Sequence, residues 1–180
     1  MLLLVGLGNP GSDYTNTRHN IGFKIIDAIN LHFKLSKQKP KFKGLLTTGN
    51  IEEKKIYAIK PLTFMNNSGT AIKELIDYFK IDAKDVIVFH DDMDIDFGKI
   101  KAKFGGSSAG HNGIESIDKF IGKEYSRVRI GIGHPKQKKK VNNHVLEDFK
   151  EDEEEKIKEI TENIVKQIPT LIDKKIDLFS

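Results

Sequence analysis

Three histidines lie next to segments whose apolar pattern predicts a strand or a helix. His19 lies in the segment TRHN before a periodic apolar stretch, His90 opens HDDMD after a short apolar run, and His111 lies in GHNG before another periodic stretch. A neutral imidazole is the usual general base near neutral pH, and a neighbouring carboxylate can hold its tautomer. His19 acting on water, with Asp91 as its partner, is therefore one candidate arrangement. Sequence spacing leaves their contact open, and a surface or capping role is the ordinary explanation for any single histidine.

Other classes of reactive site have weaker support. The chain contains no cysteine, which excludes thiolate nucleophiles, disulfides and cysteine-based zinc sites. Asp91, Asp92 and Asp94 lie near histidines, but adjacent side chains of an extended chain point to opposite sides, and no H-x-x-x-H spacing occurs. The G-x-S-x-G motif of serine hydrolases is also missing from the sequence. We therefore expect neither a metal site nor a serine nucleophile.

Three asparagines in turn-rich segments supply neutral amides. Asn9 lies in GNPG, Asn66 in FMNNSG and Asn112 in HNG. A side-chain amide both donates and accepts hydrogen bonds, which suits a peptide backbone or a carbonyl under attack. Asparagine is common in loops, so each residue alone is compatible with satisfying the backbone. Together the three residues indicate a cleft lined by amides.

Residues 6–11, GLGNPG, match the G-x-G-x-x-G fingerprint of dinucleotide-binding folds. That fingerprint requires its third glycine to open a helix whose N-terminal amides bind a pyrophosphate. Here Gly11 is followed by the turn-forming segment SDYTNT, and the apolar period begins only at Ile21. The acidic residue about 20 positions on, Asp27, falls inside that expected helix. The segment after Gly11 therefore argues against a nucleotide-dependent oxidoreductase. The glycines instead predict a sharp turn that brings Asn9 to the end of a strand.

Strand and helix patterns alternate along the chain, which predicts a layered α/β fold. Apolar runs and alternations predict strands at residues 2–7, 45–51, 55–60, 86–90, 100–104 and 127–132. Helical spacing predicts helices at residues 21–33, 71–79, 112–121 and from Glu151, with a short second helix past Pro169. Residues 136–140 form a basic loop. Because no repeat or linker interrupts the 180 residues, we expect one domain, 1–180.

Charge is distributed unevenly along the chain. The formal net charge is +4, with 24 Lys and Arg against 15 Asp and Glu in residues 1–146 and 6 against 11 in residues 147–180. A basic body suits a nucleic acid partner, although solvated lysines produce the same balance. The apolar start lacks the basic residues and length of a signal peptide, and no apolar run approaches the roughly 20 residues of a membrane span. A reducing cytoplasm fits the missing cysteines.

Five segments, in this order, resemble the signatures of bacterial peptidyl-tRNA hydrolases. They are residues 5–22 (VGLGNPG and YTNTRHNIG), 60–69 (KPLTFMNNSG), 90–94 (HDDMD), 105–113 (GGS and GHNG) and 127–135 (RVRIGIGHP). The resemblance extends from residue 2 to about residue 135. Asn67 stands where many members carry an apolar residue, and paired serines precede Gly110. Neither departure touches a proposed catalytic position.

The resemblance implies a single-domain α/β fold, with a mixed, mostly parallel twisted sheet and helices on both faces. It also implies hydrolysis of the ester that joins a peptide to the 3′-terminal ribose of tRNA. In this scheme His19 is the general base that activates water, Asp91 orients it, and Asn9 positions the imidazole or the water. The implied partner is peptidyl-tRNA, no cofactor and no metal are involved, and a cytoplasmic monomer is expected.

The resemblance further implies residues that bind the substrate. Those around the cleft are Tyr14, Met65, Asn66, His111 and Asn112. Lys103 and Arg129 fall where the family grips the tRNA 5′-phosphate, and Lys99, Lys101 and Lys103 alternate along one face of an expected strand. A catalytically inactive RNA-binding protein of the same fold is the alternative. Loss of the proposed base or of its carboxylate partner would favour that alternative, and both residues are present.

Overall fold

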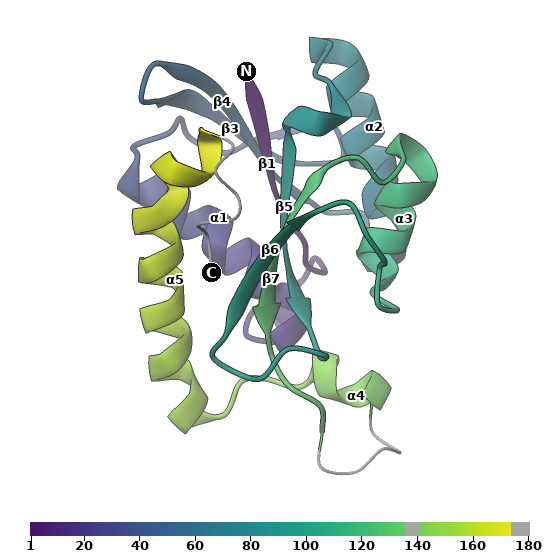
Figure 1. The fold of residues 1–180 in the computed structure, drawn as a ribbon, viewed down its shortest axis with the longest axis vertical. Coiled ribbons are helices and arrows are strands. Elements are labelled where there is room, and N and C mark those ends of the chain that lie inside the picture. The colour runs from purple at the N-terminus through teal and green to yellow at the C-terminus, as the bar shows by residue number, and fades with distance from the viewer. Residues whose placement is uncertain (136–140, 174–180) are drawn as a thin grey trace.

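The computed structural model describes residues 1–135 and 141–173, and its centre is one twisted seven-stranded sheet (Figure 1). The strand order is β2-β3-β4-β1-β5-β7-β6. The four central strands β4, β1, β5 and β7 are parallel, whereas β2, β3 and β6 form antiparallel pairings at the two edges. The strands are β1 (Leu2–Gly6), β2 (Lys39–Lys41), β3 (Gly44–Ile51), β4 (Lys54–Pro61), β5 (Val86–Asp92), β6 (Ile100–Phe104) and β7 (Ser126–Gly131). The predicted mixed, mostly parallel sheet is confirmed.

Helices cover both faces of this sheet, as predicted. One apolar cluster packs α1 and α5 on one face, and another packs α2 and α3 on the other (Figure 1). The helices are α1 (Ile21–His32), α2 (Ser68–Phe79), α3 (Asn112–Ile121), α4 (Val141–Leu146) and α5 (Glu151–Ile172), with 3₁₀ turns at Ser12–Tyr14, Arg18–Asn20, Met65–Asn67 and Ala83–Asp85. Within the described part of the chain, no helix has the length and apolar character needed to cross a membrane.

Strand β1 shows how the sequence builds the two layers. All five of its residues are buried. Leu2 and Leu4 belong to the apolar cluster on the α1 and α5 side, whereas Leu3 and Val5 belong to the cluster on the α2 and α3 side. Successive side chains of a strand point to opposite faces, so a strand covered on both sides requires an unbroken apolar run. The expected central strand is thereby confirmed.

Two glycines let α1 pack directly against the end of β1. A Cβ atom on Gly22 would lie 2.6 Å from the carbonyl oxygens of Leu7 and Phe89, and a Cβ atom on Gly6 would meet the carbonyl of Gly22. Backbone atoms cannot move aside as a flexible side chain can, so only glycine permits this approach. The first glycine of the GLGNPG motif therefore serves helix–strand packing. This packing brings His19, just before α1, to the ends of β1 and β5.

The predicted helix break at Pro169 is wrong. α5 continues through Pro169 and ends at Ile172. Proline removes one helical hydrogen bond and clashes with the preceding turn. Ile168, Leu171 and Ile172 are nonetheless almost fully buried, and their packing against the core offsets that cost. Positions 176 and 179 of the expected second helix lie outside the described residues, as does the basic loop at 136–140.

Candidate functional site

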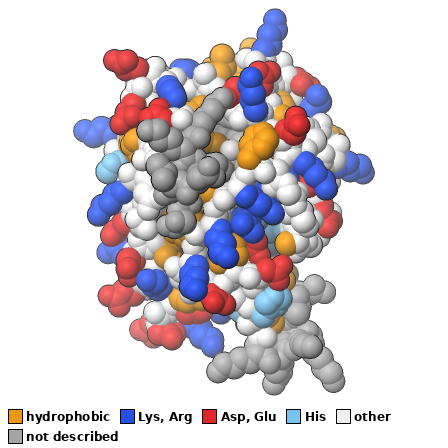
Figure 2. Space-filling view, in the orientation of Figure 1, with side chains coloured by type: hydrophobic (Ala, Val, Ile, Leu, Met, Phe, Trp, Pro, Cys, Tyr) orange, Lys and Arg blue, Asp and Glu red, His pale blue; other side chains and the backbone are white. Residues whose placement is uncertain are grey.

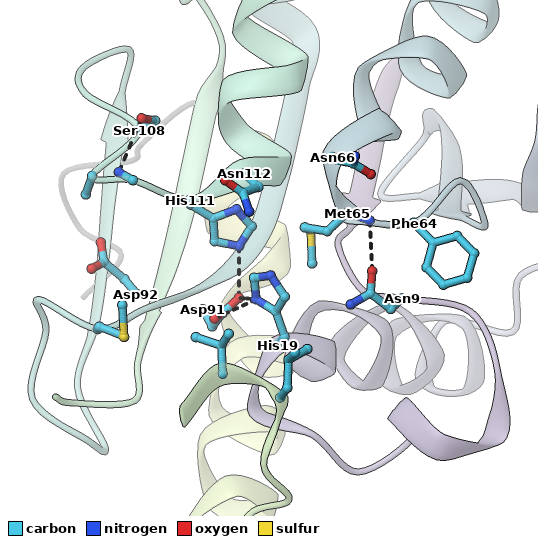
Figure 3. Close-up of a pocket in the computed structure, with 15 residues that line it drawn as sticks. Asn9, His19, Phe64, Met65, Asn66, Asp91, Asp92, Ser108, His111 and Asn112 are labelled. Atoms are coloured by element: carbon cyan, nitrogen blue, oxygen red, sulfur yellow. Dashed lines mark hydrogen bonds and ion pairs between the residues drawn. The ribbon is translucent and has the colours of Figure 1, made fainter. Parts of the chain in front are cut away.

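A cavity of about 420 Å³ opens at the carboxyl ends of β1 and β5, where parallel sheets commonly bind ligands. Segments far apart in sequence contribute its walls (Figure 3). The lining residues are Asn9, His19, Phe64, Met65, Asn66, Asp91, Asp92, Met93, Ser108, Ala109, Gly110, His111, Asn112, Val145 and Leu146. The turn after β1, the end of β5 and the start of α3 therefore converge on one space.

Most of the residues singled out from the sequence meet in this cavity. They are Asn9, His19, Met65, Asn66, Asp91, His111 and Asn112. Tyr14 is not among the lining residues, but its ring lies edge-on to that of Phe64, which does line the cavity, with 6.5 Å between ring centroids. Lys103 and Arg129 lie apart from the cavity, on β6 and β7. The apolar walls contributed by Phe64, Val145 and Leu146 were not anticipated, because an apolar residue in a short segment carries no chemical signal.

His19 and Asp91 form a buried hydrogen-bonded pair at the bottom of the cavity (Figure 3). Nδ1 of His19 lies 2.9 Å from both carboxylate oxygens of Asp91. An ionised carboxylate only accepts hydrogen bonds, so Nδ1 carries the proton and Nε2 keeps a lone pair. Burial disfavours the charged imidazole, but the charge and hydrogen bond of Asp91 outweigh it, so the pKa of His19 lies above its ordinary value. The pair is a proton acceptor held in one tautomer.

His111 is a second partner of the same carboxylate. Its Nε2 lies 2.9 Å from Oδ1 of Asp91, and its Nδ1 accepts hydrogen bonds from the backbone N–H groups of Gly113 at 3.1 Å and Ile114 at 3.3 Å. Burial raises the pKa of Asp91, but the charges and hydrogen bonds of the two imidazoles outweigh it, so the pKa lies below its usual range. We refer to His19, Asp91 and His111 as the floor cluster.

The floor cluster offers three ligand atoms within 4.8 Å of one another, a spacing compatible with a metal ion. A coordinating imidazole nitrogen must have its lone pair free. Nδ1 of His111 uses its lone pair for the α3 backbone, so a neutral ring carries its proton on Nε2, the atom that faces Asp91. Hydrogen bonds therefore account for the spacing. The donor set fits proton transfer better than metal coordination.

The side chain of Asn9 is held in one orientation by the neighbouring 3₁₀ turn. Its Oδ1 accepts a hydrogen bond of 2.8 Å from the backbone N–H of Met65. Because the oxygen is engaged, Nδ2 is the free end of the amide, and Figure 3 shows it on the His19 side of the cavity. Phe64, just before the turn, adopts φ 55° and ψ 157°, a strained conformation for a residue other than glycine. Asn9 thus presents a donor beside the proton acceptor.

Asn20 is a buried residue of this site that the sequence patterns did not identify. Its Oδ1 accepts from the Asn9 backbone N–H at 2.8 Å, and its Nδ2 donates to the Asn9 carbonyl at 2.9 Å. Asn20 follows His19 directly in the turn Arg18–Asn20, so one short turn holds both the imidazole and the Asn9 loop. A polar residue before a helix usually indicates an N-cap. Here its side chain makes no capping hydrogen bond to α1.

Four cations share one face of the outer strands β6 and β7. Lys103 lies opposite Arg127 in the antiparallel register, and Lys101 lies opposite Arg129. Side chains two residues apart on a strand point to the same face, so all four charges are neighbours. Figure 2 shows Lys and Arg side chains gathered over this part of the surface. We refer to Lys101, Lys103, Arg127 and Arg129 as the basic edge.

The charges of the basic edge are only partly compensated. Arg127 is paired with Asp118 at 2.9 Å, whereas Arg129 meets Asp92 at 3.8 Å. The buried Nε of Arg129 has no hydrogen-bond partner among the described residues. Burial and the two arginines lower the pKa of Lys103. Like charges opposite one another destabilise a sheet, so this arrangement suits an anion that would bind there.

Known proteins are similar to this chain over nearly its whole length. A family model described as peptidyl-tRNA hydrolase matches residues 3–179. The peptidyl-tRNA hydrolase of Pelagibacter ubique (strain HTCC1062) is 74% identical over 180 residues, which cover 100% of this chain and 97% of that protein. The peptidyl-tRNA hydrolase of Bartonella henselae (strain ATCC 49882 / DSM 28221 / CCUG 30454 / Houston 1) is 46% identical over 172 residues, with coverage of 96% and 89%.

A solved structure has the same fold. The crystal structure of peptidyl-tRNA hydrolase from Acinetobacter baumannii at 1.00 Å resolution superposes with a TM-score of 0.93 at 35% sequence identity. The match covers 99% of this chain and 91% of the other. The similarity therefore extends past residue 135, where the sequence motifs end, into α4 and α5.

Proposed function

The chain belongs to the peptidyl-tRNA hydrolase family, and we propose that it hydrolyses the ester between peptide and tRNA with His19 as the general base. One observation carries the assignment of the base. His19 is held by Asp91 through Nδ1 at 2.9 Å, and its ring lines the cavity. Its Nε2 makes no hydrogen bond to another described residue, so a lone pair is available to a substrate water.

The reaction begins with a water molecule hydrogen-bonded to Nε2 of His19. The imidazole takes a proton from the water while the water oxygen forms a bond to the ester carbonyl carbon, and Asp91 stabilises the resulting imidazolium. The tetrahedral intermediate collapses when the bond to the ribose oxygen breaks, and His19 returns the proton to that oxygen. The products are a peptide carboxylic acid, which ionises at neutral pH, and tRNA with a free ribose hydroxyl.

Amide donors assist this chemistry. Nδ2 of Asn9 donates to the attacking water or to the carbonyl oxygen as negative charge develops, a type of contact worth about 10²- to 10³-fold in rate. Asn66 and Asn112 line the same cavity from the turn after β4 and the start of α3. We assign binding of the peptide and of the tRNA end to Asn66, Asn112, Met65, Tyr14 and His111.

Lys103 and Arg129 bind a tRNA phosphate in this proposal. This role is supported by the partly compensated charge of the basic edge and by the Nε of Arg129, which has no hydrogen-bond partner in the described part of the chain. Nζ of Lys103 donates to the carbonyl of Ser107 at 3.2 Å, and the next residue, Ser108, lines the cavity. A phosphate held at the basic edge would therefore lie beside the loop that borders the reacting ester.

The experiment that tests this function is release of labelled N-acetyl-aminoacyl groups from tRNA. A positioned general base contributes about 10²- to 10⁴-fold, so we expect His19→Ala to lose at least that factor in turnover while its thermal unfolding stays similar. His32→Ala, which removes an exposed histidine of α1, is the matched control and keeps wild-type turnover. Near-normal release by His19→Ala would remove His19 from the mechanism.

The alternative of an inactive RNA-binding protein is not favoured, because His19, Asp91 and Asn9 are all present. Tight tRNA binding by the wild type without any release would restore that alternative. We also propose that the protein works in the cytoplasm as a monomer. The cysteine-free composition supports the compartment, and light scattering during gel filtration measures the mass in solution.

A further inference from the structure

We infer that His111 is a positioning residue that acts through Asp91: its Nδ1 fixes the start of α3, and its Nε2 shares the charge of Asp91 with His19. This inference rests on the proposed function, because it gives the shared charge a consequence for the base. The contacts of the two ring nitrogens carry it, since each nitrogen has a different partner. Lining the substrate cavity requires neither contact.

The contacts at Nδ1 decide the tautomer of His111. Backbone N–H groups can only donate, and those of Gly113 and Ile114 both point at Nδ1, at 3.1 Å and 3.3 Å. Nδ1 must therefore keep a lone pair, which places the single proton of the neutral ring on Nε2. That N–H donates to Oδ1 of Asp91 at 2.9 Å. The cap of α3 thus sets the direction of a hydrogen bond in the floor cluster.

Two histidine rings pack against the ring of His111. The ring of His90 is edge-on, with 4.9 Å between centroids, and burial lowers the pKa of His90 to about 3, so this neighbour is uncharged near neutral pH. The ring centroid of His19 lies 4.8 Å from that of His111. Asp91 is therefore the charged group that Nε2 of His111 meets.

Sharing Asp91 has a direct consequence for His19. A carboxylate that already accepts one hydrogen bond holds less charge for its second partner, so the donor from His111 weakens the pull of Asp91 on the His19 proton. Without that donor, His19 would bind its proton more tightly and be a free base only at higher pH. His111 therefore keeps the base deprotonated over more of the neutral range. The carboxylate of Asp92 also lines the cavity, but its ion-pair partner is Arg129, at 3.8 Å.

Two substitutions separate the two tasks of the ring. Asn in His111→Asn places Oδ1 near the position of Nδ1 and is a favoured N-cap, but it is too short to reach Asp91. Gln in His111→Gln places an N–H near the position of Nε2, but it gives up the acceptor that caps α3. Each variant therefore removes one contact and keeps the other. Both reduce the size of the side chain, so they control for each other.

The decisive measurement is the titration of the His19 ring by NMR in the absence of substrate, with His19→Ala used to assign its signal. We expect the midpoint to rise by about half a unit to one unit in His111→Asn, the size of one hydrogen bond. In His111→Gln we expect a midpoint close to wild type and a melting temperature about 2–4 °C lower, as for a lost cap.

An unchanged or lowered midpoint in His111→Asn would overturn the inference, as would equal shifts in both variants. The pH profile of peptide release, measured alongside, tests the proposed function separately. A His19 titration that shifts while the release profile stays in place would support the role of His111 and refute His19 as the base. Profiles that shift together with the titration support both.

Discussion

The floor cluster, whose carboxylate Asp91 lies on β5, and the basic edge on the next strands β7 and β6 are neighbours, yet they are built in opposite ways. In the floor cluster, Asp91 accepts hydrogen bonds from two imidazoles at 2.9 Å, and the carboxylate is buried. At the basic edge, cations face one another across the register, and Arg129 meets Asp92 only at 3.8 Å. Short hydrogen bonds specify atomic positions, whereas a group of charges creates a field that salt screens. Proton transfer requires fixed atomic positions, whereas binding a polyanion requires only the field.

The largest effect is expected for Asp91→Asn, which removes the carboxylate that holds His19 in one tautomer. The amide can present its N–H to Nδ1 of His19, which favours the tautomer that carries its proton on Nε2 and has no lone pair for water. We expect turnover to fall by about 10²- to 10⁴-fold with little loss of folding. Steady-state release assays measure the effect. Asp94→Asn, at an exposed carboxylate paired with His134, is the matched control and should behave as wild type.

The residual activity of Asp91→Asn carries a second signature. The rate rises with pH as His19 loses its proton, and the charge of Asp91 holds the pKa of His19 above its ordinary value. Removing that charge lowers the pKa, so the acid-side limb of the pH–rate profile should move to lower pH. A limb that stays in place would mean that Asp91 does not control the titration of the base.

The same contrast explains which parts were predictable from sequence. Helix α3 was predicted at its observed bounds, because Ile114, Ile117 and Ile121 recur at helical spacing. β2 and α4 were missed, because they are only three and six residues long, and their sequences KPK and VNNHVL carry no clear period. Local periodicity reports elements that are long enough to repeat it. Short polar elements depend on tertiary contacts instead.

The floor cluster was beyond local patterns for a different reason. His19 and Asp91 are 72 residues apart, and their contact exists only because β1 lies beside β5 and two glycines let α1 approach. The reciprocal pairing of Asn20 with Asn9 likewise depends on how two loops meet. The resemblance to known hydrolases named His19, Asp91 and Asn9, but it did not identify Asn20, which holds the Asn9 loop. By contrast, alternation along one strand placed Lys101 and Lys103 on a common face before any fold was known.

An intermediate test removes a support of the floor cluster rather than a member. Asn20→Ala takes away two buried hydrogen bonds to the Asn9 backbone. We expect the free energy of unfolding to fall by about 1–3 kcal/mol. Turnover should fall by roughly 10-fold, because the Asn9 amide loses its fixed position beside the base. Urea unfolding and release assays measure the two effects.

The control for this variant is Asn16→Ala, which removes an exposed hydrogen bond from Lys24. It should change neither stability nor turnover. If Asn20→Ala is destabilised but releases peptide at the wild-type rate, then the orientation of Asn9 does not limit catalysis. Catalysis would then require fixed atomic positions in the floor cluster but not at Asn9.

The smallest effect is expected at the basic edge, where Lys103→Ala should leave turnover at saturating substrate unchanged. Loss of one phosphate contact lowers the slope of log affinity against log salt by somewhat under one unit. Binding of tRNA measured across a salt series gives that slope, and Lys158→Ala, an exposed lysine of α5 on the other face of the sheet, should leave it unchanged. An identical slope for Lys103→Ala would mean that no phosphate binds there. The facing cations of β6 and β7 would then destabilise the sheet without a compensating role, and the contrast between precision and charge would fail.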